Sequence, residues 1–126
     1  MLDARQIKKD FPILTEGVHY LDSAATTQKP QAVLDAVMDY YKSANANPHR
    51  SAHKFGQAAT DSYENARATV AKFINAKSER EIVFTKNATE SLNILSNYFM
   101  RTLKDGDEIL ITIAEHHANF VNWQEV

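Results

Sequence analysis

The sequence predicts an α/β fold in which helices dominate, and three observations support this class. Apolar residues recur at helical spacing in several long segments. Two short runs rich in β-branched and apolar residues, 81–85 and 108–113, lie on either side of one of these helical segments. Strand, helix and strand in this order form a βαβ unit, for which two parallel strands and a right-handed crossover are expected.

Composition narrows the possible functions. The 126 residues are 44% hydrophobic and 24% charged, as in a globular chain with one small core. A net charge of −2 gives no electrostatic case for nucleic-acid binding. No apolar run approaches the roughly 20 residues of a membrane span, and the charged N-terminal segment does not resemble a secretory signal, so no membrane association is expected. The absence of cysteine excludes thiolate chemistry within these residues, and three glycines exclude a glycine-rich phosphate loop.

The first half of the chain contains two predicted helices and one predicted strand. The first helix is capped by Asp3 and should end near Phe11, which precedes a proline. Residues 18–21 have the composition of a short strand, followed by a turn of small residues. Pro30 then opens a second helix, which should end at the turn-forming residues 45–48.

The second half contains the βαβ unit. A long helix over about residues 55–74 precedes it and has one apolar stripe. The strand 81–85 is followed by Asn87 and Glu90, whose types and spacing predict a capping box at the start of the next helix. That helix leads to the second strand, 108–113.

The junction after the first strand of the βαβ unit is a candidate anion site. Backbone N–H groups in the first turn of a helix lack intrahelical acceptors, and the hydroxyl of Thr89 adds another donor. Ligands of open α/β sheets bind outside the carboxyl ends of strands, where this turn should lie. The alternative is that the same residues form a capped helix and nothing more.

A pair of histidines after the second strand is the other candidate. His116 and His117 should emerge at the same sheet edge as Thr89. Adjacent side chains of an extended segment point to opposite faces, so at most one histidine can meet a given ligand, by stacking or by proton transfer. The alternative is a pair of loop histidines that bind only backbone or solvent.

His49 and His53 form a weaker constellation. They are four residues apart, which suits two metal ligands on one helix. Pro48 and the residues before it make a continuous helix there doubtful, and no HExxH pattern supports a catalytic zinc. No metal site is therefore expected, although a histidine-based metal module remains an alternative.

Together, five segments resemble the first third of a SUF-type cysteine desulfurase, a member of the class V aminotransferase group of fold-type I enzymes that depend on pyridoxal phosphate. The segments are YLDSAATTQKP (20–30), NPHRSAH (47–53), EIVFT (81–85), NATESLN (87–93), and EHHANFV (115–121) with Trp123 and Gln124. The resemblance implies the N-terminal part of the large domain of that fold, with helices packed on a short parallel βαβ sheet. Residues 1–19 would form a segment that packs on the small domain, and residues 20–126 the beginning of the cofactor-binding domain.

The resemblance also assigns roles to particular residues. Ala88 and Thr89 match the turn that binds the cofactor phosphate. His116 matches the catalytic histidine that stacks on the pyridine ring and is proposed to shuttle protons. The residues that match the substrate pocket and its entrance are Ala24, Ala25, His49 and Arg50. Glu90 and Asn93 match positions at the boundary of cofactor and subunit.

Two departures from the family pattern stand near these residues. Asn87-Ala88 replaces the Gly-Thr that is common in the phosphate turn, which removes one hydroxyl. Asn122 replaces a usual proline after Val121, which is expected to alter the start of the next helix.

The implied activity is conversion of L-cysteine to L-alanine, with the sulfur left as an enzyme persulfide for iron–sulfur cluster assembly. The implied enzyme is a cytoplasmic homodimer that passes sulfur to an acceptor protein. Its Schiff-base lysine, persulfide cysteine and carboxylate-binding arginine have no match here, so this chain is expected to be an N-terminal fragment, inactive alone, with weak or no cofactor binding. Open alternatives are a selenocysteine lyase, another class V aminotransferase-like enzyme, or a non-catalytic folding or dimerisation module.

Overall fold

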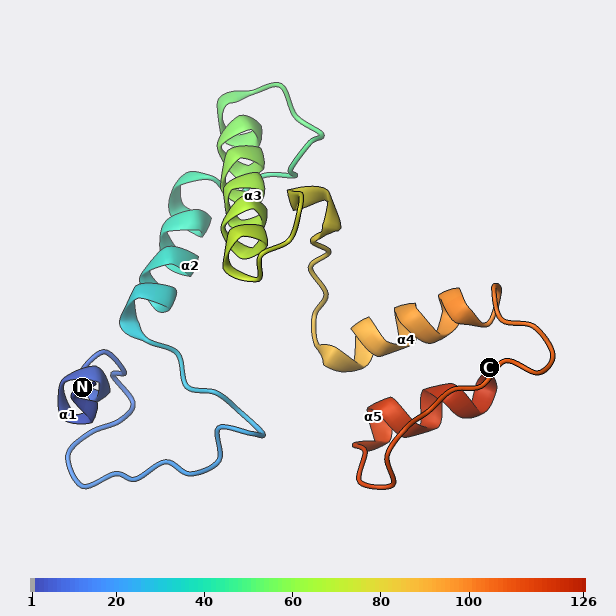
Figure 1. Cartoon of the computed structure of the whole chain (residues 1–126). Helices are drawn as coiled ribbons and strands as arrows, with labels where there is room; N and C mark the ends of the chain where they lie inside the picture. Colours follow the sequence, from blue (N-terminus) through green and yellow to red (C-terminus); the bar gives the residue numbers. More distant parts are fainter. Residues whose placement is uncertain (1) are drawn as a thin grey trace. The chain divides into compact units, whose positions relative to one another are not determined.

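The computed structural model describes residues 2–126, and all regular structure in this range is helical (Figure 1). The first compact unit ends at Glu79, and the second is Arg80–Val126. The elements in order are α1 (Ala4–Lys8), α2 (Gln31–Ser43), α3 (Lys54–Phe73), η1 (Glu79–Glu81), α4 (Ala88–Phe99), α5 (His117–Phe120) and η2 (Val121–Glu125), where η denotes a 3-10 helix.

The start of α1 confirms the predicted cap. The Asp3 carboxylate accepts hydrogen bonds from the backbone N–H groups of Arg5, at 3.0 Å, and Gln6, at 3.4 Å. The helix ends at Lys8, earlier than the predicted end near Phe11. Turn-type backbone bonds replace the α-helical pattern after this point, as expected where a proline follows and disfavours helical backbone.

The two long helices of the first unit match their predicted ranges. Helix α2 begins directly after Pro30 and ends before the turn-forming residues 45–48. Helix α3 is capped by His53, whose ring nitrogen Nδ1 accepts a hydrogen bond from the N–H of Gly56 at 3.3 Å. Ala59, only 1% exposed, lies on the buried side of α3.

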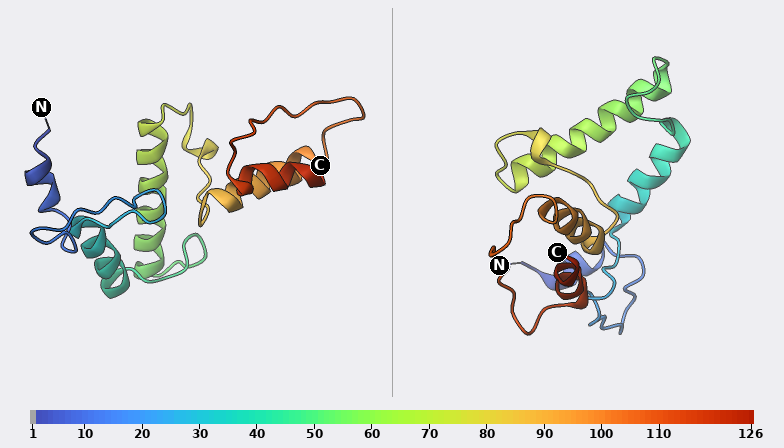
Figure 2. Two further views of the ribbon diagram at one scale, coloured as in Figure 1. Left: turned by 90° about the horizontal axis from the view of Figure 1, so that it is seen from below. Right: turned by 90° about the vertical axis from the view of Figure 1, so that its right-hand side faces the viewer.

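The second unit is built on α4. Segments α5 and η2 pack along this helix, and the rings of Phe99 and Trp123 meet with their centroids 6.0 Å apart. Three views show α4 and the α5–η2 segment side by side and running in the same direction (Figures 1 and 2). The first turns of α4 and α5 therefore lie at the same end of this unit.

The predicted strands are not formed. Among residues 2–126, none of the segments 18–21, 81–85 and 108–113 has strand structure, so the expected βαβ sheet is absent. The physical reason is that a strand exists only when it is paired, and parallel strands are normally stable only in larger sheets that are covered on both faces. Both segments of the predicted βαβ unit are largely non-helical, and Val83, Leu110 and Ile113 are 73%, 99% and 101% exposed.

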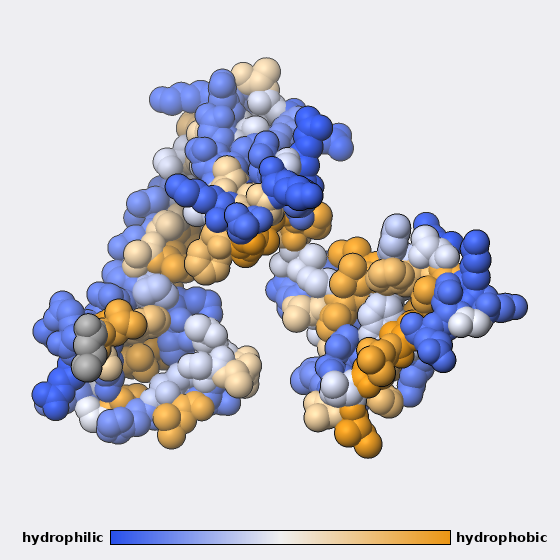
Figure 3. Space-filling view, in the orientation of Figure 1, coloured by the Kyte–Doolittle hydropathy of each residue, from blue (hydrophilic) through white to orange (hydrophobic). Residues whose placement is uncertain are grey.

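The expected single small core is also missing from the described residues. The buried apolar residues there are Ala44, Ala59, Ala71 and Ile82, and no large side chain is fully buried. Apolar side chains instead reach the surface of each unit (Figure 3). Without a sheet, the apolar stripes of the helices have no common face to cover. No helix in residues 2–126 combines the length and hydropathy that would cross a bilayer.

Candidate active site

The first turn of α4 has the predicted cap in a shifted form. The Asn87 side-chain oxygen accepts from the N–H of Glu90 at 2.9 Å, as in a capping box. The Glu90 carboxylate reaches back one residue further than predicted and accepts from the N–H of Lys86 at 2.7 Å. The two bonds hold the turn from both sides, which fixes the direction of its backbone N–H groups.

This turn leaves three hydrogen-bond donors available. Within the described chain, the N–H groups of Ala88 and Thr89 and the hydroxyl of Thr89 donate to no acceptor. Both residues are exposed. Three unpartnered donors at the positive end of a helix dipole are the chemistry that binds a phosphate group, so these residues fit the phosphate of the implied cofactor.

His116 is placed at the start of α5. It is the N-cap of that helix, and its Nδ1 accepts a hydrogen bond from the N–H of Ala118 at 3.1 Å. A neutral imidazole that accepts at Nδ1 carries its proton on Nε2. The residue is exposed, and Nε2 has no hydrogen-bond partner among residues 2–126. His117, in contrast, is the first residue of the helix.

A chain of hydrogen bonds follows His116 along the turn. The Glu115 carboxylate accepts from the Thr112 hydroxyl and from the Asn119 amide, each at 2.9 Å. The amide oxygen of Asn119 accepts in turn from the indole N–H of Trp123 at 3.0 Å. Because the amide of Asn119 and the hydroxyl of Thr112 both donate to its carboxylate, the pKa of Glu115 lies below its ordinary value.

Two residues predicted to bind cofactor, Thr89 and His116, therefore belong to the first turns of helices that lie side by side. These turns are at the same end of the second unit (Figures 1 and 2). The structure brings the predicted phosphate turn and the predicted ring-stacking histidine to one end of one unit, although the sheet that was expected to do this is absent.

The predicted substrate-pocket residues belong to the first unit. Ala24 and Ala25 are exposed in a turn, where the N–H of Ala25 donates to the carbonyl of Asp22 at 3.2 Å. The hydroxyl of Tyr20 donates to the same carbonyl at 3.1 Å and also to the carbonyl of Thr26. The hydroxyl of Tyr20 thus stabilises the turn, and the side chains of Ala24 and Ala25 are exposed to solvent.

His49 and Arg50 lie in the loop before α3 and border a hollow of about 450 Å³. His49 has a left-handed backbone, with φ of 60°, and three contacts hold it there. Its N–H donates to the Thr60 hydroxyl at 2.9 Å, its Nε2 is 3.1 Å from the Glu64 carboxylate, and its ring meets the Tyr63 ring edge-on, with centroids 5.8 Å apart.

The metal alternative receives no support from this geometry. His53 caps α3 while His49 precedes it in a left-handed loop conformation, so the two histidines do not share a helix face. No group of three or more histidine, cysteine, aspartate or glutamate side chains in residues 2–126 is arranged to hold a metal ion.

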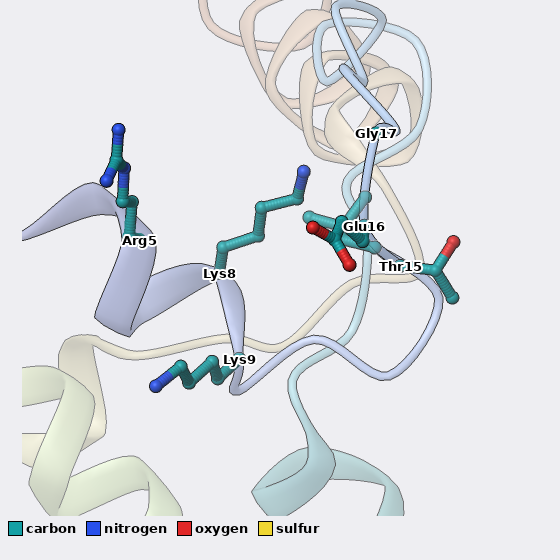
Figure 4. Close-up of a pocket in the computed structure, with 7 residues that line it drawn as sticks. Arg5, Lys8, Lys9, Thr15, Glu16 and Gly17 are labelled. Carbon is teal, nitrogen blue, oxygen red and sulfur yellow. The ribbon is translucent and has the colours of Figure 1, made fainter.

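A further hollow, of about 480 Å³, lies beside α1 and contains none of the predicted site residues. Lys8 extends from α1 toward the loop that contains Glu16 (Figure 4). Its ammonium group donates to the carbonyl of Val18, which ties this loop to α1. The bond gives Lys8 a structural role at this end of the first unit.

Three residues that organise the candidate site were not predicted to do so. Glu64 holds His49, and Asn119 and Trp123 continue the hydrogen-bond chain from Glu115. The spacing of the last set is a usable signal, because Glu115, Asn119 and Trp123 recur every four residues and such side chains meet on one helical face.

The exposed turn of α4 and the capped His116 stay a predicted cofactor site, and the family of the chain follows from its sequence. The sequence pattern of the family described as Aminotransferase class-V matches residues 19–126. The chain belongs to this family.

Cysteine desulfurases are among the proteins similar to this chain. A probable cysteine desulfurase of Synechocystis sp. is 53% identical over 98% of the chain, and one from Staphylococcus aureus is 49% identical over the same share. The solved apo structure of a cysteine desulfurase from Thermococcus onnurineus NA1 matches 99% of the chain with a TM-score of 0.91 and 42% identity. A cysteine desulfurase from Escherichia coli matches with a TM-score of 0.80 and 41% identity.

The match covers only part of each relative. The chain spans 31% of the Synechocystis protein and 32% of the Staphylococcus protein, and 31% and 32% of the two solved chains. The chain therefore corresponds to about a third of the length of each of these relatives.

Proposed function

We propose that the protein containing this chain is a pyridoxal-phosphate-dependent cysteine desulfurase. It would convert L-cysteine to L-alanine and hold the released sulfur as a persulfide on a cysteine elsewhere in the protein, for iron–sulfur cluster assembly. The observation that carries the proposal is the 53% identity to a probable cysteine desulfurase over 98% of the chain. The donors at the α4 turn and the geometry of His116 support the proposal, because they fit a cofactor phosphate and a ring-stacking histidine.

In this proposal the α4 turn binds the phosphate of the cofactor. The N–H groups of Ala88 and Thr89 and the Thr89 hydroxyl donate to phosphate oxygens, and the helix dipole favours the negative charge. The side chains of Asn87 and Glu90 hold the turn in place before any ligand binds, because they accept hydrogen bonds from the N–H groups of Glu90 and Lys86. Binding then requires little reorganisation of the turn.

His116 acts at the ring of the cofactor. Bound pyridoxal phosphate supplies an electron sink for cleavage of bonds at the substrate's α-carbon. His116 would stack on that ring, and its Nε2, which carries the proton in this geometry, is the atom that would exchange a proton with the substrate. Because Nδ1 already accepts from Ala118, proton transfer is restricted to Nε2.

For the first unit, the proposal concerns the substrate, and it rests on the resemblance of four residues to substrate positions of the family. Ala24 and Ala25 line the pocket for a small amino acid, since their methyl groups occupy little space. His49 and Arg50 match positions near the entrance of that pocket. The bonds of His49 to Thr60 and Glu64 would hold this loop in place.

The remaining features of the proposal concern the whole protein. Residues 81–85 and 108–113 become parallel strands of the sheet of the large domain, with the rest of the chain as partners. The enzyme is a cytoplasmic homodimer, and a sulfur-acceptor protein removes the persulfide sulfur. The exposed apolar side chains of these two segments support the sheet, because a buried parallel strand is apolar on both faces.

The test uses the full-length protein loaded with pyridoxal phosphate. Alanine and sulfide are measured after addition of L-cysteine and a thiol reductant, with L-selenocysteine in parallel. Equal amounts of alanine and sulfide support the proposal, while turnover of L-selenocysteine alone would replace it with a selenocysteine lyase. His116→Ala should lower turnover by about 100-fold or more, since general acid–base groups contribute 10²–10⁴-fold. His117→Ala is the matched control and should retain the rate.

A further inference from the structure

Hydrogen bonds among residues 115–119 surround His116. Glu115 precedes the histidine, and its carboxylate is bound by the side chain of Asn119, four residues later. The backbone N–H of Asn119 donates to the carbonyl of His116 at 2.8 Å, and the N–H of Ala118 donates to the His116 ring. The backbone and the imidazole of His116 are thus each held by a separate bond within one turn.

Trp123 links these hydrogen bonds to α4. The indole N–H of Trp123 donates to the amide oxygen of Asn119, and its ring packs against Phe99 of α4. Both ends of the Asn119 amide are occupied, the nitrogen by Glu115 and the oxygen by Trp123. A flipped amide would direct its NH₂ group at the indole N–H and its oxygen at the Glu115 carboxylate, so only one orientation is stable.

We propose that Glu115, Asn119 and Trp123 are positioning residues for His116: their hydrogen-bond chain holds the turn in which the N–H of Ala118 donates to Nδ1 of His116, and so keeps the imidazole proton on Nε2. The role of this chain in catalysis rests on the proposed function, while its effect on the imidazole is a property of the protein itself. Side chains on a packed helical turn hold a group more accurately than a free loop does, and a displacement of about 1 Å can cost about 100-fold in rate.

The substitutions at Glu115 separate hydrogen bonding from charge. In Glu115→Gln, the amide oxygen can accept from Asn119 while its NH₂ group donates to the Thr112 hydroxyl, which can reverse its role. The chain of bonds survives without the negative charge. In Glu115→Ala both bonds are lost, and in Asn119→Ala the links to Glu115 and Trp123 are lost together.

The experiment compares full-length Glu115→Ala, Asn119→Ala and Glu115→Gln with the wild type, and uses Glu125→Ala as the control for loss of an exposed carboxylate from the same unit. The primary readout is the ¹⁵N spectrum of the His116 imidazole, without and with pyridoxal phosphate, assigned through His116→Ala. The second readout is kcat and KM for L-cysteine.

The wild type, Glu115→Gln and Glu125→Ala should show a proton on Nε2 and an accepting Nδ1. Glu115→Ala and Asn119→Ala should show a mixture of tautomers and a kcat that is about 10- to 100-fold lower, with KM little changed. Unchanged imidazole signals in both alanine variants would overturn the inference, even in an active enzyme. If the wild type does not act on L-cysteine, the proposed function fails, and the imidazole signals still decide the positioning role.

If Glu115→Ala does not fold, a second variant, Trp123→Phe, still tests the proposal. Trp123→Phe keeps an aromatic ring that can pack on Phe99 and removes the indole donor to Asn119, together with part of the ring volume. This variant should shift the tautomer balance in the same direction by a smaller amount. Imidazole signals of the wild-type form in both Trp123→Phe and Asn119→Ala would contradict the proposal.

Discussion

Thr89 is the one side chain that adds a donor to the phosphate-type turn of α4. Its hydroxyl has no partner within residues 2–126, so its removal breaks no internal bond. Thr89→Ala should weaken pyridoxal phosphate binding to the full-length protein by roughly 10- to 100-fold, since a hydrogen bond to a charged group is worth about 1.5–3 kcal/mol. Equilibrium dialysis or the cofactor's absorbance measures the dissociation constant. Thr89→Ser is the matched control, and equal affinity in the alanine variant would place the phosphate elsewhere.

Glu115 is a second single residue with a testable effect, because it makes the stability of the folded protein depend on pH. Its pKa is lowered by the Asn119 and Thr112 donors, so the ionised form is favoured in the folded protein. Its contribution to stability is therefore complete above the ordinary glutamate pKa and is lost as the pH falls through the lowered value. The side-chain amide signal of Asn119 in an NMR titration should stay constant down to the ordinary glutamate pKa and change only below it. Glu115→Gln should abolish that acid step, and a step that persists in this variant would assign it to another group.

At the scale of elements, the sequence was sufficient for some of the helices. Caps and apolar stripes predicted α2, α3 and the start of α4 closely, because these signals act within one turn and need no distant partner. The C-terminal end of α1 was placed too late, since helix ends depend on weak local preferences. The left-handed His49 loop was not predicted, because contacts from α3 impose it on a residue that rarely adopts this conformation.

Gly56 shows how α3 and this loop fit together. A methyl group at Gly56 would lie 2.3 Å from the Cβ and 2.6 Å from the carbonyl oxygen of Ser51, so the loop that carries Arg50 must move. Gly56→Ala should destabilise the protein by about 1–2 kcal/mol, since overpacking costs about 1–3 kcal/mol and the gain in helix propensity is at most about 1 kcal/mol.

Urea unfolding of the full-length protein measures this effect. Gln57→Ala, at the exposed neighbouring position of α3, is the matched control. The KM for L-cysteine should also rise in Gly56→Ala, because the loop contains His49 and Arg50. Equal stability of the two variants would mean that the Ser51 loop can move away from α3 without cost.

At the scale of the whole molecule, the local structure around two predicted site residues was easier to predict than the sheet, and the roles of these residues stay predictions. Thr89 and His116 were found from short motifs, and both keep their local geometry on the turns of α4 and α5. The sheet depends on pairing partners and covering layers, which a chain spanning 31% of its relatives does not itself supply. A β-branched run therefore predicts that a segment tends to be extended, while a strand also requires neighbouring strands to pair with.

This difference makes a prediction about the two apolar segments. In the full-length protein, residues 82–85 and 109–113 should pair as central parallel strands, and their amide protons should exchange with solvent slowly. In the isolated 126-residue chain the same amides should exchange at nearly unprotected rates, because Leu110 and Ile113 are 99% and 101% exposed there. Hydrogen–deuterium exchange with mass spectrometry compares the two proteins segment by segment. Helix α3 is the internal reference, because its hydrogen bonds lie within the helix and need no sheet partner. Fast exchange of both segments in the full-length protein would exclude them from its sheet, and the side-by-side packing of α4 and α5 would then be what brings Thr89 and His116 to one end of the unit.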